Sequence, residues 1–490
     1  MIAILLFCVA CAVYWLWSWK NEKTTEPPLY PGAWPILGHI PRLMTVGDSC
    51  AALHFIEELA TYCTSVGGVM SSKIGPVTHY VLTDPDDCLT VSNACLEKDP
   101  YYGFAEAWLG DGLVLARCLT WKTHRKLLNP AFSQTLLDTF IGVFNSQSRK
   151  LVKELDKEVG KGPFHHLSNI RHNALETICI TALGVDFSDP NLNSDYFEAS
   201  DTMFYIFVER FFKFWWHFDC TFAWSRLKKK QDACLKILHN MSDTVLQKRK
   251  SKLYENNTST ESSEPGRNFK PFIDILLELA AEKGAFTDKQ IRNHIDTILV
   301  GGQDTSTTIL VYTTLLLGSH PEAQEKMFTE LQEVLGEGRD VEKTDLSKLV
   351  YLEAFLKESM RFYSIAPLVI RRTETDVKLK NYTLSAGKSC WLLFCGIHRH
   401  PMWGPDAHEF HPERWLEPGR LPDNPSAFAA FSLGKRNCIG KVYAMMSMKT
   451  TLAHILRRYR IKSDITQLRF KLDTMMKPHS GHWISIEKRT

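Results

Sequence analysis

The chain has 490 residues, of which 44% are hydrophobic, and its net charge is only +3. That balance allows a large core but gives no basic surface of the kind that binds nucleic acid, so nucleic acid is excluded as a partner. The 13 cysteines are an odd number, scattered along the chain without the spacing of a zinc site, a pattern that suits a reducing compartment and does not require disulfides.

The first segment, residues 1–19, contains no charged side chain and is followed by Lys20 and Lys23. A helix of this length is about long enough to span a hydrocarbon core, and lysines just after its tryptophans predict that the rest of the chain is cytoplasmic. We therefore expect a single-pass transmembrane signal anchor. The alternative is a signal peptide cleaved near residues 10–12, but the missing basic n-region and the longer apolar run favour the anchor.

Prolines are dense in the next segment, residues 20–34, which is expected to form a semi-rigid hinge. The remaining residues, 35–490, show mostly helical periodicity, with few strand-like runs such as 77–82 and 389–394. Length alone suggests about three domains. The informative motifs, however, run from the N-terminal third almost to the C-terminus and would form one site. We predict one domain, mainly α with a minor β-sheet.

Two features precede the middle of the chain. Trp121 and Arg125 are four residues apart, so a helix would present both on one face. Further on, the segment 203–222 is crowded with aromatic residues. Two interpretations of it stay open: helical core packing, or an apolar surface that dips into a bilayer and lines a substrate entrance.

The clearest helix is predicted from Thr287 to about Leu317. Thr287 and Gln290 form a capping box, and Gly318 followed by Pro321 ends the helix. Some 30 residues make a rod of about 45 Å, which would cross the whole domain.

The middle of this helix reads G-G-Q-D-T-S. Two interior glycines, Gly301 and Gly302, cost about 2 kcal/mol relative to alanine. A flat ligand that lies against the bare backbone would offset this cost. Thr305 can bond a carbonyl in the preceding turn. Together with the carboxylate of Asp304, its hydroxyl could deliver protons in a dry cavity.

Four charged residues after this helix are also informative. Glu358 and Arg361 place opposite charges on one helical face, although this pattern alone is a weak signal. Arg371 lies ten residues further on, and Arg414 lies in the segment F-H-P-E-R-W of residues 410–415.

The most informative segment is F-S-L-G-K-R-N-C-I-G, residues 431–440. A thiolate that binds a haem iron needs backbone N–H groups turned toward its sulfur and a low local dielectric. Cys438 is placed for that role. Gly434 would supply a tight turn, Gly440 would let the following helix pack closely, and Arg436 offers donors to a haem propionate.

These motifs resemble those of the cytochromes P-450, the haem-thiolate monooxygenases. All five fixed positions of that family's cysteine loop are matched: Phe431, Gly434, Arg436, Cys438 and Gly440. Residues 108–132 are similar to the same region in the animal microsomal family-4 clan, including its insect members. The resemblance implies a cytochrome P-450 fold, with a single haem domain behind the anchor.

The resemblance also implies roles for the residues. Those implied for haem binding are Trp121, Arg125, Gly302, Arg371, Phe431, Gly434, Arg436, Cys438 and Gly440. Cys438 would be the iron ligand, and Asp304 and Thr305 would be the catalytic pair that relays protons. Glu358, Arg361 and Arg414 would form a structural ionic network that fixes the cysteine loop. Family-4 hydroxylases often attach haem b covalently through a glutamate at the position of Gly301, so we expect a non-covalent haem.

The implied function is oxidation of an apolar substrate (a fatty acid, hormone-like lipid, odorant or xenobiotic) with O2 at the endoplasmic reticulum membrane. No flavin or nicotinamide motif is present, so the implied electron donor is NADPH–cytochrome P-450 reductase, with cytochrome b5 as a second donor. Basic residues that could form its docking face, or simply be solvated, are Lys122, Arg125, Lys126, Lys435 and Lys441. The alternatives are a haem-thiolate isomerase or dehydratase and a non-catalytic haem sensor, both disfavoured by the Asp304–Thr305 pair.

Overall fold

The computed structural model describes residues 26–185, 190–258, 269–336 and 338–489. The predicted anchor, residues 1–19, and the first part of the predicted hinge lie outside the described residues. Within the described ranges, no helix is both long and apolar enough to cross a bilayer. The last part of the hinge packs against the globule, because Leu29 forms a β-bridge with Ser71 and Tyr30 is buried.

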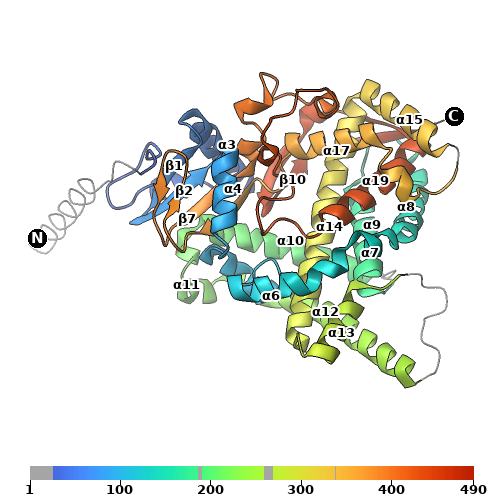
Figure 1. Ribbon diagram of the computed structural model, residues 1–490, viewed down its shortest axis with the longest axis horizontal. Coiled ribbons are helices and arrows are strands. Elements are labelled where there is room, and N and C mark those ends of the chain that lie inside the picture. The colour runs from blue at the N-terminus through green and yellow to red at the C-terminus, as the bar shows by residue number, and fades with distance from the viewer. Residues whose placement is uncertain (1–25, 186–189, 259–268, 337, 490) are drawn as a thin grey trace, which may run out of the picture.

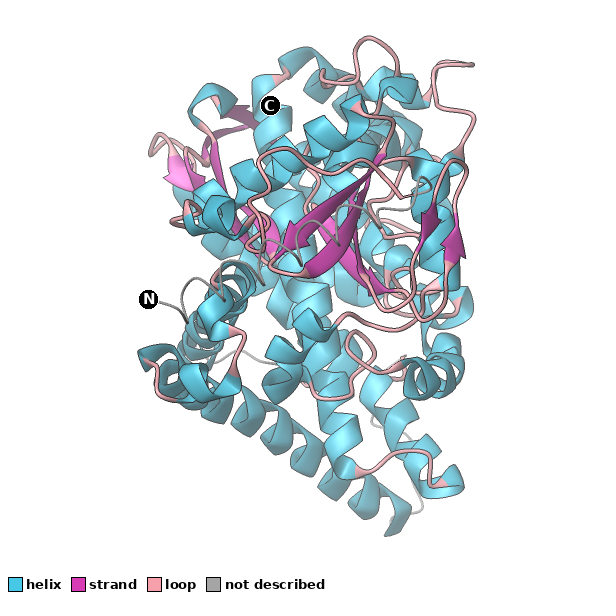
Figure 2. Cartoon of the chain, turned by 90° about the vertical axis from the view of Figure 1, so that its left-hand side faces the viewer, coloured by secondary structure: helices cyan, strands magenta, loops and turns pink. Residues whose placement is uncertain are grey.

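Helices dominate the described chain and the strands are short, as predicted (Figure 2). The helices before the central one are α2 (Ile40–Met44), α3 (Ser49–Ser65), α4 (Pro85–Ala94), α5 (Glu106–Leu109), α6 (Cys118–Leu128), α7 (Gln134–Asp138), α8 (Ile141–Leu155), α9 (Leu167–Ile178), α10 (Pro190–Phe212), α11 (Asp219–Ala223), α12 (Arg226–Thr258) and α13 (Phe272–Lys283). The central helix and those after it are α14 (Asp288–Ser319), α15 (Pro321–Leu335), α16 (Lys343–Leu346), α17 (Val350–Phe362), α18 (Phe394–Ile397) and α19 (Lys441–Arg458).

The strands are β1 (Val69–Ile74), β2 (Val77–Leu82), β3 (Phe164–His165), β4 (Leu368–Arg372), β5 (Val377–Lys378), β6 (Thr383–Leu384), β7 (Ser389–Leu393), β8 (Tyr459–Ser463), β9 (Arg469–Asp473), β10 (Met475–Ser480) and β11 (Trp483–Lys488). The largest sheet has the order β1-β2-β7-β4. Both predicted strand segments meet in it, since β2 pairs with β7 in parallel. Phe394, expected at the end of the second strand, instead begins α18. Strand β4 pairs antiparallel with β7 and so places Arg371 opposite Cys390.

Helix α14 runs through the middle of the molecule (Figure 1). Its predicted capping box is confirmed, because the Thr287 side chain accepts from the Gln290 N–H and the Gln290 side chain accepts from the Thr287 N–H. The helix spans 32 residues and most of its side chains are buried. It continues one residue past the predicted stop at Gly318, and Pro321 opens α15.

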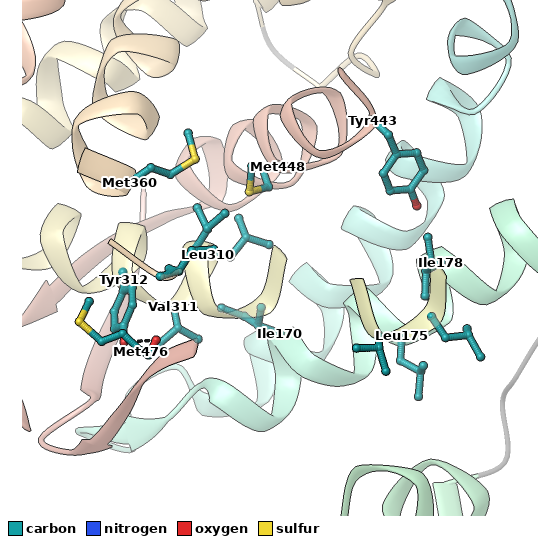
Figure 3. Close-up of a cluster of buried hydrophobic side chains, with 14 of the residues drawn as sticks. Ile170, Leu175, Ile178, Leu310, Val311, Tyr312, Met360, Tyr443, Met448 and Met476 are labelled. Carbon is teal, nitrogen blue, oxygen red and sulfur yellow. Dashed lines mark hydrogen bonds between the residues drawn. The ribbon is translucent and has the colours of Figure 1, made fainter. Parts of the chain in front are cut away.

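The core packs around α14. Figure 3 shows Leu310, Val311 and Tyr312 of α14 among buried side chains of α9, α17 and α19. The buried hydroxyl of Tyr312 donates to the carbonyl of Met476 in β10, at an O–O distance of 2.9 Å. This polar contact ties the hairpin of β9 and β10 to the central helix.

Candidate functional site

A cavity of about 340 Å³ lies between the middle of α14 and the loop that carries Cys438. Helix α14 contributes Gly301, Gly302 and Thr305, and the side chain of Cys438 is exposed to the cavity. The other walls come from α6, α9, β4 and the start of α19. Motifs distant in the sequence therefore meet in one site, as predicted.

Backbone N–H groups hold the cysteine loop, and one of them bonds to its sulfur. The N–H of Cys438 donates to the carbonyl of Phe431 (N–O 2.9 Å), and the Gly440 amide bonds to the Cys438 sulfur. Burial raises the pKa of the Cys438 thiol, while the Gly440 N–H, Arg125 and Lys441 act to lower it. The groups that favour a thiolate are thus in place, and a bound metal would complete the stabilisation of its negative charge.

The two glycines of the loop serve different purposes. Gly434 has a φ of 66°, and a Cβ there would lie 2.8 Å from the Cβ of Ser92. The predicted tight turn is therefore confirmed. A Cβ on Gly440 would lie 3.9 Å from the Cys438 sulfur, which is an ordinary contact. The expectation that Gly440 permits close helix packing is therefore wrong. What Gly440 contributes is its backbone amide, which bonds to the Cys438 sulfur.

Four basic side chains line the cavity: Lys98, Arg125, Arg371 and Arg436. Lys98 and Arg371 face each other across a β-bridge. Burial, together with Arg371 and Arg436, holds the pKa of Lys98 well below its usual value. Burial and Arg371 likewise lower the pKa of Arg436 to about 10. Like charges gathered in a dry cavity are unfavourable by themselves and favour a bound anion.

The free donors of these arginines test whether a haem fits. Among the described residues, Nε of Arg371 and both Nε and Nη1 of Arg436 are buried without a hydrogen-bond partner. Leaving such donors unpaired is costly, and propionate carboxylates are the acceptors that match them. With the accessible thiol of Cys438 as a ligand, the residues present fit a haem.

The predicted propionate contacts on α6 also brace the cysteine loop. Arg125 and Trp121 both line the cavity. Nη1 of Arg125 donates to the carbonyl of Asn437 (2.9 Å), and the Arg436 guanidinium lies over the Trp121 ring. Nη2 of Arg436 donates to the carbonyl of Ala116 (2.6 Å). The loop and α6 are therefore held together by several contacts at once.

The two glycines of α14, Gly301 and Gly302, are required for different reasons. An added Cβ on Gly301 would have no atom within 4 Å, so this residue leaves room for a flat ligand, as predicted. A Cβ on Gly302 would lie 2.7 Å from Cδ1 of Ile178 in α9. Gly302 lines the cavity, but its lack of a side chain is required by this close helix–helix contact.

Asp304 and Thr305 face different surroundings. The Thr305 hydroxyl donates to the carbonyl of Gly301 (2.6 Å), the predicted bond to the preceding turn, and lies in the cavity. Asp304 is 3% exposed and pairs with Lys477 of β10 (Oδ1–Nζ 2.8 Å). Successive helical residues are rotated by about 100°, so neighbours in the sequence point to different sides. The structure therefore places Thr305 at the ligand space and Asp304 behind it.

Glu358, Arg361 and Arg414 form a buried ionic cluster, and each side chain is 0% exposed. The Glu358 carboxylate accepts from Nη2 of Arg361 (2.7 Å) and Nε of Arg414 (3.0 Å). It also accepts from the indole of Trp415 (3.0 Å). Burial acts to raise the pKa of Glu358, but the two arginines hold it below its usual value. Every charge in the cluster is thus paired, which is the condition for burying it.

His398 joins this cluster to the cysteine loop. Nη1 of Arg361 donates to the carbonyl of His398 (2.9 Å), and the N–H of Ala429 donates to Nε2 of His398 (2.9 Å). Burial, Arg361 and Arg399 lower the pKa of His398 to about 3, so its ring is neutral and Nε2 can accept. Ala429 precedes Phe431 by two residues, so the cluster positions the start of the loop.

Sequence reasoning missed three residues of the site and its support. Lys98 lines the cavity, Lys477 pairs with Asp304, and His398 holds Ala429. Each acts through a partner in another segment, so no spacing rule in the sequence identifies it. Their chemistry is visible only after folding.

The aromatic segment 203–222 is partly buried and partly exposed. It folds into the end of α10, the short helix η5 (Phe214–Trp216) and α11. Phe204 and Phe222 are buried, whereas Phe218 is 61% exposed and nearby Trp224 is 92% exposed. Core packing therefore accounts for most of the segment, and an apolar surface remains around α11.

Comparisons with known proteins show the family. The sequence profile of the family described as Cytochrome P450 matches residues 27–484. The chain is 30% identical over 483 residues to human Cytochrome P450 4V2, covering 96% of this chain and 91% of that protein. It is 33% identical to Probable cytochrome P450 4s3 of Drosophila melanogaster, with 84% and 83% covered, and 31% identical to Cytochrome P450 4c21 of Blattella germanica, with 80% of each covered.

Proposed function

This chain belongs to the cytochrome P450 family, and from that premise we propose that it is a membrane-bound monooxygenase that hydroxylates or epoxidises an apolar substrate. One oxygen atom of O2 enters the substrate and the other leaves as water, with protons and electrons consumed in equal number. The observation that carries the proposal is the thiol of Cys438, exposed to the same cavity as Thr305 of α14.

The residues of the protein would have the following roles. When bound, the haem supplies the activation of O2, with Cys438 as the iron ligand. The unpaired donors of Arg371 and Arg436 would hold its propionates, and Trp121 and Arg125 would support that edge. The Thr305 hydroxyl stands in the cavity, where it can hand on a proton. The apolar walls exclude bulk water from the reaction.

We propose a non-covalent haem b. The wall of α14 presents Gly301, which has no side chain that could form an ester with the haem. Retention would then depend on the thiolate bond and on the propionate contacts. Release of unmodified haem into acidified organic solvent would support this assignment, and haem that stays with the protein would refute it.

Two exposed apolar surfaces support the proposal that an apolar substrate reaches the site from the endoplasmic reticulum membrane. Phe218 and Trp224 project near α11, and Trp34 and Met44 are 61% and 63% exposed near the N-terminal end of the described chain. Figure 1 places α11 and the β1–β2 hairpin at the same end of the molecule. Such patches suit a bilayer surface, and we propose that the anchor of residues 1–19 holds this end there, with the catalytic domain cytoplasmic.

Electrons must come from a separate protein, and we propose NADPH–cytochrome P-450 reductase, with cytochrome b5 as a second donor. Exposed lysines beside the cysteine loop support an acidic partner: Lys122, Lys126, Lys435 and Lys441. Arg125, expected among them, is instead engaged with Asn437. Charge complementarity of this kind mainly speeds association, and it weakens with salt.

Two measurements test the proposed function. The carbonyl adduct of the reduced holoprotein should show the red-shifted absorption band of thiolate ligation, and Cys438→Ser should abolish it. Turnover should also stop when NADPH or the reductase is withheld. Retained conversion of a lipid hydroperoxide without them would instead identify an isomerase or dehydratase.

A further inference from the structure

The ion pair between Lys477 and Asp304 is buried behind the ligand cavity. Nζ of Lys477 lies 2.8 Å from Oδ1 of Asp304, and the side chains are 12% and 5% exposed. In the part of the chain that the structure describes, Oδ2 of Asp304 is buried without a hydrogen-bond partner, and so is the hydroxyl of nearby Tyr196. It is energetically costly to leave one oxygen of a buried carboxylate without a hydrogen-bond donor, which suggests that the arrangement has a function.

Lys477 also reaches toward the surface. Its Nζ lies 3.5 Å from Oδ1 of Asp201 in α10 and 4.6 Å from the ring centroid of Phe204. Asp201 is 45% exposed and accepts from both terminal nitrogens of Arg171, at 2.7 Å each. Burial acts to raise the pKa of Asp201, but Arg171 and Lys477 hold it below its usual value. One lysine therefore bridges a solvent-exposed carboxylate and a buried one.

We propose that Lys477 is a positioning residue for proton supply, which joins Asp304 to solvent through Asp201. This inference rests on the proposed monooxygenase function, because the reduction of one oxygen atom of O2 to water consumes protons at the cavity. Thr305, adjacent to Asp304 in α14, is the hydroxyl on the cavity side of the route.

Protons are conserved along the proposed route. A proton taken up from water at Asp201 passes to Lys477 as the ammonium gives one N–H proton to Oδ1 of Asp304. Asp201 returns to a carboxylate, Lys477 remains an ammonium, and Asp304 becomes a neutral acid. Because Asp304 lies behind Thr305 in the resting structure, rotation of the neutral side chain would carry its proton to the cavity side of α14. Among the described residues, Tyr196 and Tyr312 also interact electrostatically with Asp304, and burial raises the pKa of both phenols well above the usual value, so they stay neutral at physiological pH.

The test compares Lys477→Met with Lys477→Arg in the full-length, haem-loaded protein, supplied with the reductase, NADPH and a turned-over substrate. Lys477→Met should lower product formed per NADPH consumed on the order of tenfold, the effect typical of a supporting residue, and Lys477→Arg should restore it. Lys471→Met is the matched control. Lys471 lies in the same hairpin and pairs with Asp473, not with α14.

A second readout needs no turnover. In the resting protein at neutral pH, Lys477→Met should add a protonated-carboxyl band to the infrared spectrum, and this band should vanish in the Lys477→Met, Asp304→Asn double variant. Should Lys477→Met fail to fold, Asp201→Asn gives the kinetic test, with the same fall in product per NADPH.

Either of two results would overturn the proposal: Lys477→Met with normal product yield and no new band, or an equal loss in Lys471→Met. These failures are distinct from failure of the proposed function. The latter would remove the red-shifted carbonyl band or the reductase dependence from the unmodified protein, whereas failure of the route alone would leave both intact.

Discussion

The guanidinium carbon of Arg436 lies 4.7 Å from the centroid of the Trp121 ring. This contact stacks the cysteine loop on helix α6 and turns the remaining arginine donors toward the cavity. An arginine held in this way loses little further freedom on binding a carboxylate. The anion-binding site is therefore preorganised before any ligand arrives.

Arg371→Met should weaken haem binding. The residue is buried in the cavity wall with a free donor, and loss of one charge-assisted hydrogen bond costs about 1.5–3 kcal/mol, which is roughly tenfold to a hundredfold in affinity. Haem transfer to an apo acceptor protein gives the measurement. Arg372→Met is the control, since Arg372 is adjacent in β4 but is not among the cavity-lining residues. Equal loss in both variants would contradict the assignment.

Glu358→Gln should strongly destabilise the protein. It removes the charge that pairs with two fully buried arginines, and breaking a buried ion pair costs about 3–5 kcal/mol. Denaturant unfolding measures the free energy change. Glu417→Gln disrupts the exposed pair with Arg420 and should cost no more than about 1 kcal/mol. A small effect in Glu358→Gln would mean that the cluster does not hold the loop.

Stability should fall as the pH drops below about 6.5, the value for histidine in an unfolded chain. The pKa of His398 is lowered to about 3 in the folded state. Between these values the unfolded chain binds the proton and the folded chain does not, so folding loses free energy as pH falls. His398→Gln should flatten this slope, because the amide can still accept from Ala429 without titrating. The free energy of unfolding of both proteins, measured from pH 7 to 4.5, checks this prediction. An unchanged dependence on pH in His398→Gln would contradict the role of His398.

Replacing Phe218 and Trp224 by serine should weaken vesicle binding of a chain that starts at residue 26. Burial of one such aromatic side chain contributes about 1.5–3 kcal/mol, so the double change should cost at least tenfold in partition. Trp215 and Trp216 of the same aromatic segment are half-buried, and Trp216 packs against both Trp215 and Phe222, so they are poorer tests. Leu119→Ser, which changes an exposed leucine on α6, is the control. Unchanged binding in the double variant would exclude this surface.

The sequence by itself determined the features that depend on local geometry. The capping box at Thr287, the turn at Gly434 and the bond from Thr305 to Gly301 each join residues within one or two turns of the chain. Such contacts follow from backbone geometry and residue type alone. The cysteine loop belongs to the same class, because its ligand, turn and arginine lie within ten residues.

Only the tertiary structure decided which way Asp304 faces and what it meets. Lys477 lies far along the chain and reaches Asp304 because β10 packs on α14, where Tyr312 holds the carbonyl of Met476. The same is true of Lys98, brought to Arg371 by a β-bridge. The energy of a buried charge depends on all its neighbours at once. Those neighbours come from segments whose proximity is set by packing of the whole core, so a linear motif cannot specify them.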